Sequence, residues 1–304
     1  MTSPNVHAVF DKNTSNVTYV VSEPDSKDAI IIDPVLDYDA LASQTSTSTV
    51  EKVIAHIEKN GLTLRAVVET HAHADHISAA QFLKSRYSVP VAIGAGIHLV
   101  QETFGAFFNL PASVPRDGSQ FDLLLKAGEK YEFGKLEVLI LATPGHTPAC
   151  VSLHIGDAVF TGDSLFIEDY GTGRTDFPGG SARLLHQSVT KNLFTLPDAT
   201  RVFVGHDYQP GGRELRVEST IGREKEANIQ LSAATTESEF VSFRESRDAT
   251  LSPPRLIYPS VQINVFGGFL PEPAENGKRY LRTPINTRVE TDSSGSPVAS
   301  GANS

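Results

Sequence analysis

Thr70-His71-Ala72-His73-Ala74-Asp75-His76 packs three histidines and one aspartate into seven residues. The preceding residues 65–68 end in an apolar run that predicts a buried strand, and residues 77–83 predict the start of a helix. The cluster is therefore expected at the carboxyl end of a strand, where α/β sheets place their ligand sites. Imidazole nitrogen and carboxylate oxygen suit zinc, iron or manganese, so the stretch predicts a metal site.

Ligand-type side chains recur at the ends of strands predicted further along the chain. They are His146 in Gly-His-Thr, Asp163 in Gly-Asp-Ser and His206 in Gly-His-Asp. An isolated His-x-His is usually incidental, whereas this recurrence is typical of one site to which several strands contribute. The remaining histidines are expected to be structural or exposed.

The spacing inside the first cluster leaves the number of metals open. Side chains two residues apart at a strand end point the same way, so His71 and His73 could both face one metal. Asp75 and His76 lie on the turn into the predicted helix and could bind a metal at a second position.

The hydrophobic periodicity predicts two β-rich halves, each with helices outside. The first half holds a strand hairpin, an amphipathic helix over 49–61 with Asn60-Gly61 as its stop, and the strand that leads into the histidine cluster. The second half holds two hairpins, a helix over 181–196 and a last core strand over 201–208. The fold class that this predicts is α/β with four layers, two sheets packed face to face between layers of helices. The predicted hairpins pair 16–21 with 29–34, 128–134 with 136–141, and 150–155 with 158–163.

Three segments are predicted mainly from composition. Residues 39–48 are polar and are expected to form a loop with a short helical turn, and residues 213–231 are charged and expected to be helical. From Ser252 onward prolines interrupt the chain, which predicts an extended arm packed on the main domain. The predicted units are a main domain over 1–245, a C-terminal arm over 246–289 and a disordered Ser/Gly-rich tail over 290–304.

Composition excludes several broad classes of protein. The 304 residues carry a net charge of −10, which argues against a general nucleic-acid binder. No apolar run approaches the about 18 residues of a membrane span, and no signal or transit peptide is visible, so a cytoplasmic protein is expected. The one cysteine, Cys150, permits no intrachain disulfide and fits a reducing compartment, so the metal ligands must be nitrogen and oxygen.

The motifs together resemble the metallo-β-lactamase superfamily. The residues that carry the resemblance are Thr70 to His76, Thr143 to Thr147, Thr161 to Asp163 and Gly205 to Asp207. It covers roughly residues 8–230 and implies an αββα sandwich with the metal site at one edge of the sheets.

Other motifs are similar to the persulfide dioxygenases within that superfamily. They are Gly171-Thr172-Gly173-Arg174-Thr175-Asp176-Phe177, Gly145 to Cys150 and His206-Asp207-Tyr208, and the C-terminal arm is similar to the bacterial-type, lactamase- and hydrolase-like branch. Members of that family oxidise glutathione persulfide with O₂ and water to sulfite and glutathione. The resemblance also suggests a homodimer. Where some relatives carry a second cysteine, this chain has Thr172.

The resemblance implies roles for individual residues. The ligands of one Fe(2+) per chain would be His71, His146 and Asp163, a donor set that leaves positions open for O₂ and the persulfide. Arg174 and Tyr208 would bind the substrate, Arg174 through a glutathione carboxylate.

The other four members of the motifs would orient ligands and hold water. They are His73, Asp75, His76 and His206. In hydrolase relatives the same four help to bind a pair of Zn(2+) ions, so a binuclear zinc hydrolase of glutathione thioesters, of the glyoxalase II type, remains the alternative. Cys150 is expected to be a buried small residue, with an oxidisable thiol near the iron as the second interpretation.

Overall fold

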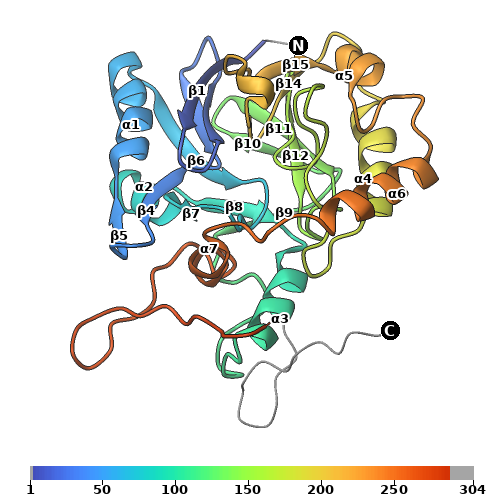
Figure 1. Cartoon of the computed structure of the whole chain (residues 1–304). Coiled ribbons are helices and arrows are strands. Elements are labelled where there is room, and N and C mark those ends of the chain that lie inside the picture. The colour runs from blue at the N-terminus through green and yellow to red at the C-terminus, as the bar shows by residue number, and fades with distance from the viewer. Residues whose placement is uncertain (1–2, 288–304) are drawn as a thin grey trace, which may run out of the picture.

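Two six-stranded sheets lie face to face, with helices on both outer sides (Figure 1). The structure is a computed structural model, and it describes residues 3–287. The architecture is the αββα sandwich that the sequence predicts. Its metal-binding motifs all follow strands of the two sheets.

The first sheet has the strand order β1-β2-β3-β6-β8-β9. β1 to β3 pair antiparallel, while β3, β6, β8 and β9 pair parallel, so the sheet is mixed. β3 and β6 are buried along most of their length, as parallel strands covered on both faces must be. The strands are β1 (Asn5–Asp11), β2 (Asn16–Ser22), β3 (Asp28–Ile32), β6 (Thr63–Glu69), β8 (Val91–Gly94) and β9 (Leu123–Leu125).

The second sheet has the strand order β10-β11-β12-β13-β14-β15. Only β13 and β14 pair parallel. The predicted hairpins of this half are confirmed by the pairing of β10 with β11 and of β12 with β13. The strands are β10 (Lys130–Phe133), β11 (Leu136–Ala142), β12 (Val151–Ile155), β13 (Ala158–Phe160), β14 (Arg201–Phe203) and β15 (Glu218–Thr220).

Within residues 3–287, seven α-helices cover the two sheets. Helix α1 has the predicted apolar stripe, because Val50, Val53, Ile54 and Ile57 are all buried, and Gly61 ends it with a left-handed φ of 57°. Helix α4 continues as a π-helical turn over Val189–Leu193. The helices are α1 (Ser48–Asn60), α2 (Ala80–Tyr87), α3 (Ile97–Phe107), α4 (Ala182–Ser188), α5 (Ile221–Ala227), α6 (Glu237–Asp248) and α7 (Ile257–Asn264).

Buried side chains form three apolar layers. One joins the first sheet to α1, α2, α3 and α7, one fills the space between the sheets, and one joins the second sheet to α4, α5 and α6. Each sheet is therefore buried on both faces, which explains the long apolar runs of its central strands.

Two predicted segments are wrong. Residues 39–48 do not form a helical turn, because β4 (Val35–Asp39) and β5 (Gln44–Ser46) pair as a hairpin that β7 (Ile77–Ser78) extends to a small sheet. Of residues 213–231 only α5 is helical, because Arg213 is held in a loop by ion pairs with Asp169 and Asp207. In both places strand pairing or ion pairs outweigh the preference that composition suggests.

The C-terminal arm also differs from its prediction. It is not extended throughout, since α7 forms within it and packs Val261 and Val265 into the core on the first sheet. The predicted boundary at residue 245 falls inside α6, which runs from Glu237 to Asp248. The predicted tail, 290–304, lies outside the described residues.

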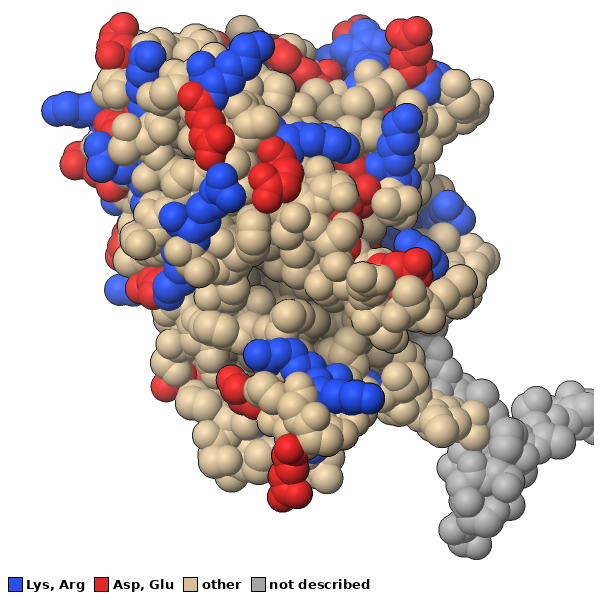
Figure 2. Space-filling model, turned by 90° about the vertical axis from the view of Figure 1, so that its left-hand side faces the viewer, with Lys and Arg blue, Asp and Glu red and all other residues tan. Residues whose placement is uncertain are grey.

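The surface seen from the side of α1 carries both signs of charge. Figure 2 shows acidic and basic side chains interspersed over this face. Surface ion pairs of this kind include Arg86 with Glu58 at 2.9 Å and Lys84 with Asp122 at 2.6 Å. Within residues 3–287, no helix combines the length and apolarity needed to cross a membrane.

Candidate metal centre

The Thr70–His76 stretch forms an irregular loop between β6 and β7. Its first residue is anchored by Asp33, which follows β3, the neighbour of β6 in the sheet. The Asp33 carboxylate accepts hydrogen bonds from the backbone nitrogen and the hydroxyl of Thr70, both at 2.7 Å. The loop therefore starts from a fixed point on the sheet.

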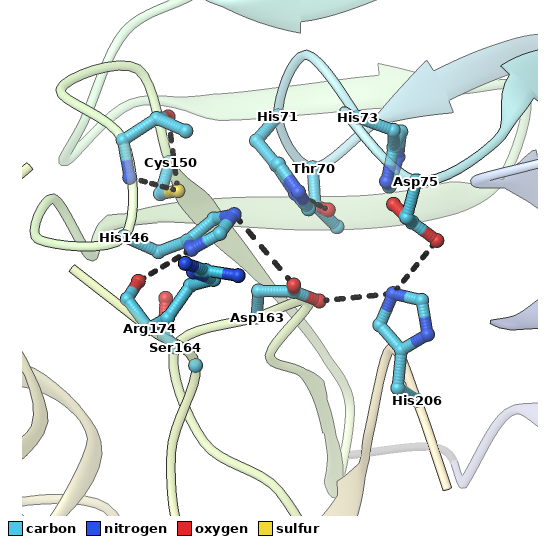
Figure 3. Close-up of polar contacts among 12 residues, drawn as sticks. Thr70, His71, His73, Asp75, His146, Cys150, Asp163, Ser164, Arg174 and His206 are labelled. Atoms are coloured by element: carbon cyan, nitrogen blue, oxygen red, sulfur yellow. Dashed lines mark hydrogen bonds and ion pairs between the residues drawn. The ribbon is translucent and has the colours of Figure 1, made fainter. Parts of the chain in front are cut away.

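Three of the predicted ligands converge at the edge of the two sheets (Figure 3). His71, His146 and Asp163 each offer a ligand atom, and the three atoms lie within 4.8 Å of one another. All three residues are buried. Gly145 precedes His146 with a φ of 149°, and a Cβ there would stand 2.4 Å from Leu185 Cα, so only glycine fits.

Hydrogen bonds orient both imidazoles of this group. His146 Nδ1 donates to the backbone oxygen of Arg174 at 2.6 Å. The Thr70 hydroxyl gives its only proton to Asp33, so His71 Nδ1 must donate to Thr70 Oγ1, at 2.9 Å. In both rings Nε2 is left with a lone pair, which is the arrangement that metal-binding histidines use.

Buried atoms without partners test whether a metal fits here. Within residues 3–287, His71 Nε2 and Asp163 Oδ1 are buried and have no hydrogen-bond partner. Burial and the neighbouring histidines lower the pKa of His71 well below its usual value, so the ring is neutral and can coordinate. Orphaned buried polar atoms are costly, and a divalent cation would satisfy these. The residues present therefore fit a metal.

Two carboxylates face Nε2 of His73. Its Nε2 lies 3.0 Å from Asp33 Oδ1 and 3.2 Å from Glu69 Oε2. Burial opposes protonation of His73, but the two carboxylates outweigh it and raise the pKa of His73 well above its usual value. The rings of His71 and His73 lie beside each other, with centroids 4.1 Å apart, although β6 ends at Glu69, before either histidine.

A second group of ligand-type atoms lies beside the first. Asp75 Oδ2 is 3.3 Å from His76 Nδ1 and 3.5 Å from His206 Nε2. Asp163 faces both groups, because its Oδ2 is 3.6 Å from His146 Nε2 and its Oδ1 is 3.4 Å from His206 Nε2. The geometry thus brings all seven predicted residues to one edge, where the ligand-type atoms of His73, Asp75 and His76 also lie within 4.8 Å of one another.

A cavity of about 640 Å³ opens on this edge. His146, Asp163 and Asp75 line it, together with aromatic side chains and both predicted substrate-binding residues, Arg174 and Tyr208. The Arg174 guanidinium is already engaged. Its Nε and Nη2 donate to the Asp176 carboxylate at 2.6 and 2.7 Å, and its Nη1 donates to the backbone oxygen of Ser252 at 2.7 Å.

Sequence reasoning missed three arginines that also line the cavity, Arg244, Arg247 and Arg255. Arg244 is buried and paired with Asp248 at 2.7 Å. Arg247 and Arg255 are exposed, and neither forms an ion pair with a described residue. Arg247 belongs to the charged face of α6, which looks like an ordinary solvated helix face in the sequence, and Arg255 follows two prolines beyond it. No local signal therefore marks either residue.

Cys150 lies at the start of the hairpin behind His146 and is buried. Its Sγ accepts from the Thr147 backbone nitrogen at 3.3 Å and contacts the Thr147 hydroxyl at 3.1 Å. Burial raises the pKa of the Cys150 thiol to about 12, so it is protonated at neutral pH. This favours the packing role over that of a reactive thiolate.

The sequence profile of the metallo-beta-lactamase superfamily matches residues 11–206, which span every ligand-type residue of this edge. The chain belongs to the metallo-β-lactamase superfamily. Within the superfamily it is 46% identical over 284 residues to a "beta-lactamase hydrolase-like protein" of Xylella fastidiosa, covering 93% of this chain and 65% of the relative. It therefore spans slightly less than two thirds of that relative's length.

Other superfamily members carry different names. The chain is 42% identical to "glyoxylase B2" of Dictyostelium discoideum, covering 88% of this chain and 92% of the relative. It is 32% identical to the human "persulfide dioxygenase ETHE1, mitochondrial", covering 75% and 76%. The crystal structure of ETHE1 from Myxococcus xanthus aligns with a TM-score of 0.70 at 32% identity, covering 87% of this chain and all of that one.

Proposed function

We propose that this metallo-β-lactamase-fold enzyme is a persulfide dioxygenase that uses one iron per chain. The reaction is GSSH + O₂ + H₂O → GSH + SO₃²⁻ + 2 H⁺, in which the outer sulfur is oxidised and O₂ is reduced. One observation carries the proposal. Two imidazoles and one carboxylate, from His71, His146 and Asp163, converge with their ligand atoms within 4.8 Å of one another.

That donor set matches the chemistry required. His71, His146 and Asp163 would hold Fe(II), which would supply open positions for O₂ and for the sulfur of the substrate. The chain's own residues hold the ligands ready, since the Arg174 carbonyl fixes the tautomer of His146. Phe177 packs edge-on against His146 at 5.2 Å and lines the cavity, where it excludes water from the reacting end.

The cavity also suits the tail of glutathione, which carries two carboxylates. Arg247 and Arg255 are the cations on its wall that have no ion pair among described residues, so we propose them as carboxylate partners beside the predicted Arg174. Tyr208 lines the same cavity and stacks on His206 with ring centroids 5.4 Å apart, which holds its phenol toward the site.

A binuclear zinc thioester hydrolase is the second candidate. Asp75, His76 and His206 lie together, and Asp163 faces both groups as a bridging carboxylate would. The names of two relatives of higher identity, hydrolase-like protein and glyoxylase, support this candidate more than the first. In it, these residues would hold a pair of zinc ions, which would supply an activated water for thioester hydrolysis.

Metal analysis combined with two activity assays separates the candidates. Freshly purified protein is analysed for iron and zinc, and O₂ uptake on glutathione persulfide is measured beside cleavage of S-lactoylglutathione. About one iron per chain with O₂ uptake supports the dioxygenase. Two zinc ions per chain with thioester cleavage and no O₂ uptake would establish the hydrolase instead. Protein reconstituted with each metal in turn is the control against a metal acquired during expression.

A further inference from the structure

Helix α7 lies against the metal-binding loop although it belongs to the C-terminal arm, some 50 residues beyond the part that matches the superfamily profile. Its last residue, Asn264, is buried and reaches the loop directly. The Asn264 Nδ2 donates to the backbone oxygens of His73 at 2.9 Å and His76 at 2.7 Å. Its Oδ1 accepts from the backbone nitrogen of Ser78 at 2.9 Å.

We propose that Asn264 is a positioning residue, which holds the metal-binding loop in the conformation that presents its ligands. Two hydrogens on Nδ2 and one carbonyl oxygen satisfy three buried backbone groups at once. The loop has little regular structure of its own, since β7 has only two residues. Asp33 fixes the beginning of the loop, and Asn264 fixes its end.

Asn264 is also linked to the side chain of His73, through Ser78 and Glu69. The Ser78 hydroxyl donates to Glu69 Oε1, and the other oxygen of Glu69 faces His73 Nε2 at 3.2 Å. The backbone nitrogen of the same Ser78 is held by Asn264. A displaced Asn264 would therefore disturb both the loop backbone and the carboxylate that faces His73.

The helix that carries Asn264 is itself held by two side-chain amides. Gln101 Nε2 donates to the backbone oxygen of Val265 at 3.0 Å, and Gln81 Nε2 donates to that of Gly267 at 2.5 Å. Val261 and Val265 pack into the core on the first sheet. These contacts fix the position of the arm on the main domain, so Asn264 can hold the metal-binding loop in place.

Asn264→Asp tests the proposal because it keeps the size of the side chain and removes both donors. The protein is stripped of metal, and its affinities for Zn²⁺ and for Fe²⁺ under anaerobic conditions are measured by competition with a chelator. We expect metal affinity to fall about 10- to 100-fold, the usual effect of losing a partner that orients ligands. Amide hydrogen exchange across residues 71–78 of the apoprotein is expected to rise.

Gln262→Ala is the matched control, since Gln262 lies on the same helix and bonds within the arm, to the backbone oxygens of Tyr258 and Arg282. It is expected to bind metal as the unmodified chain does. If Asn264→Asp melts at a lower temperature but binds metal with unchanged affinity, Asn264 is merely structural and the proposal fails.

A second variant covers the case in which Asn264→Asp does not fold. Gln81→Ala loosens the docking of the arm without touching the loop, and a smaller fall in metal affinity is expected. Unchanged affinity in that variant would also overturn the proposal. Because either metal serves as the probe, the test does not depend on whether the enzyme is a dioxygenase or a hydrolase.

Discussion

The histidines at the metal edge differ in which nitrogen of the imidazole ring faces an oxygen partner. His71 and His146 each give the proton on Nδ1 to an oxygen acceptor and keep a free Nε2. His73 is two positions from His71, yet its Nε2 faces two carboxylates. The other ring nitrogen, Nε2 in His71 and Nδ1 in His73, is buried without a hydrogen-bond partner among the described residues.

Substitution of Asp163 and of His206 tests whether the site holds one metal, as proposed. Asp163→Ala removes a proposed direct ligand, so its loss of iron should exceed the about 10- to 100-fold fall in affinity typical of an outer partner. His206→Ala should keep most of the iron. Metal content per chain, measured after dialysis, decides the question, and equal loss in both variants would indicate a binuclear site.

Arg247 and Arg255 are expected to act on substrate binding rather than on the chemistry. Each change to Gln should raise KM for glutathione persulfide roughly 5- to 30-fold, equivalent to about 1–2 kcal/mol, with kcat little changed. Isothermal titration with glutathione provides a reading that does not need turnover. Arg86→Gln, on α2 and remote from the cavity, is the control, and an unchanged KM in both cavity variants would leave Arg174 as the carboxylate partner.

At the scale of elements, α6 connects the cavity wall to the loop that follows Asp163. Buried Arg244 donates to the backbone oxygen of Thr172 at 3.2 Å, and Asp248 accepts from the backbone nitrogen of Thr175 at 2.8 Å. The helix therefore fixes the loop on which Arg174 stands. It starts at Thr236 with a capping box, in which the Thr236 and Glu239 side chains bond each other's backbone nitrogens.

Thr236→Ala removes this cap and should lower the free energy of unfolding by about 1 kcal/mol. The loss arises because the backbone nitrogen of Glu239 loses its acceptor at the first turn of the helix. Urea denaturation followed by circular dichroism measures it. Ser238→Ala in the same turn is the control, and an equal effect of both changes would mean that the cap contributes nothing.

At the scale of the whole molecule, the metal edge is where the two sheets meet. The backbone nitrogen of Val17, in β2, donates to the backbone oxygen of Gly205, next to His206, at 2.9 Å. Nearby, the Tyr19 hydroxyl donates to the backbone oxygen of Val204 at 2.6 Å. Ligands from the two halves keep their mutual distances because these bonds join the first sheet to the second.

Tyr19→Phe should reduce the free energy of unfolding by about 1–3 kcal/mol, because a buried carbonyl loses its partner while the ring remains packed. Phe160 and Phe203 contact that ring edge-on, so the change leaves no cavity. Chemical denaturation at neutral pH is the measurement. Tyr131→Phe, at a half-buried hydroxyl in β10, is the control, and a Tyr19→Phe protein as stable as the unmodified chain would contradict the role given to this bond.

Sequence patterns predicted most of the helices and strands that tertiary packing also stabilises. The stripe of α1 and the hairpins of the second sheet follow from periodicity, since burial on one side of a regular element leaves a repeating pattern. The patterns failed at 39–48 and 213–231, where paired backbone or ion pairs hold polar residues in place. They also missed α7, because the prolines around it suggested an extended chain.

The sequence by itself determined the fold, its membership of a superfamily and the set of seven ligand-type residues, because these depend on residue types and their local order. Only the tertiary structure decided which of those residues face one another. His73 turns to Asp33 and Glu69, Arg174 is held by Asp176, and Asn264 reaches the loop from 188 and 191 residues away. Such contacts join distant parts of the chain, so no pattern of neighbouring residues records them.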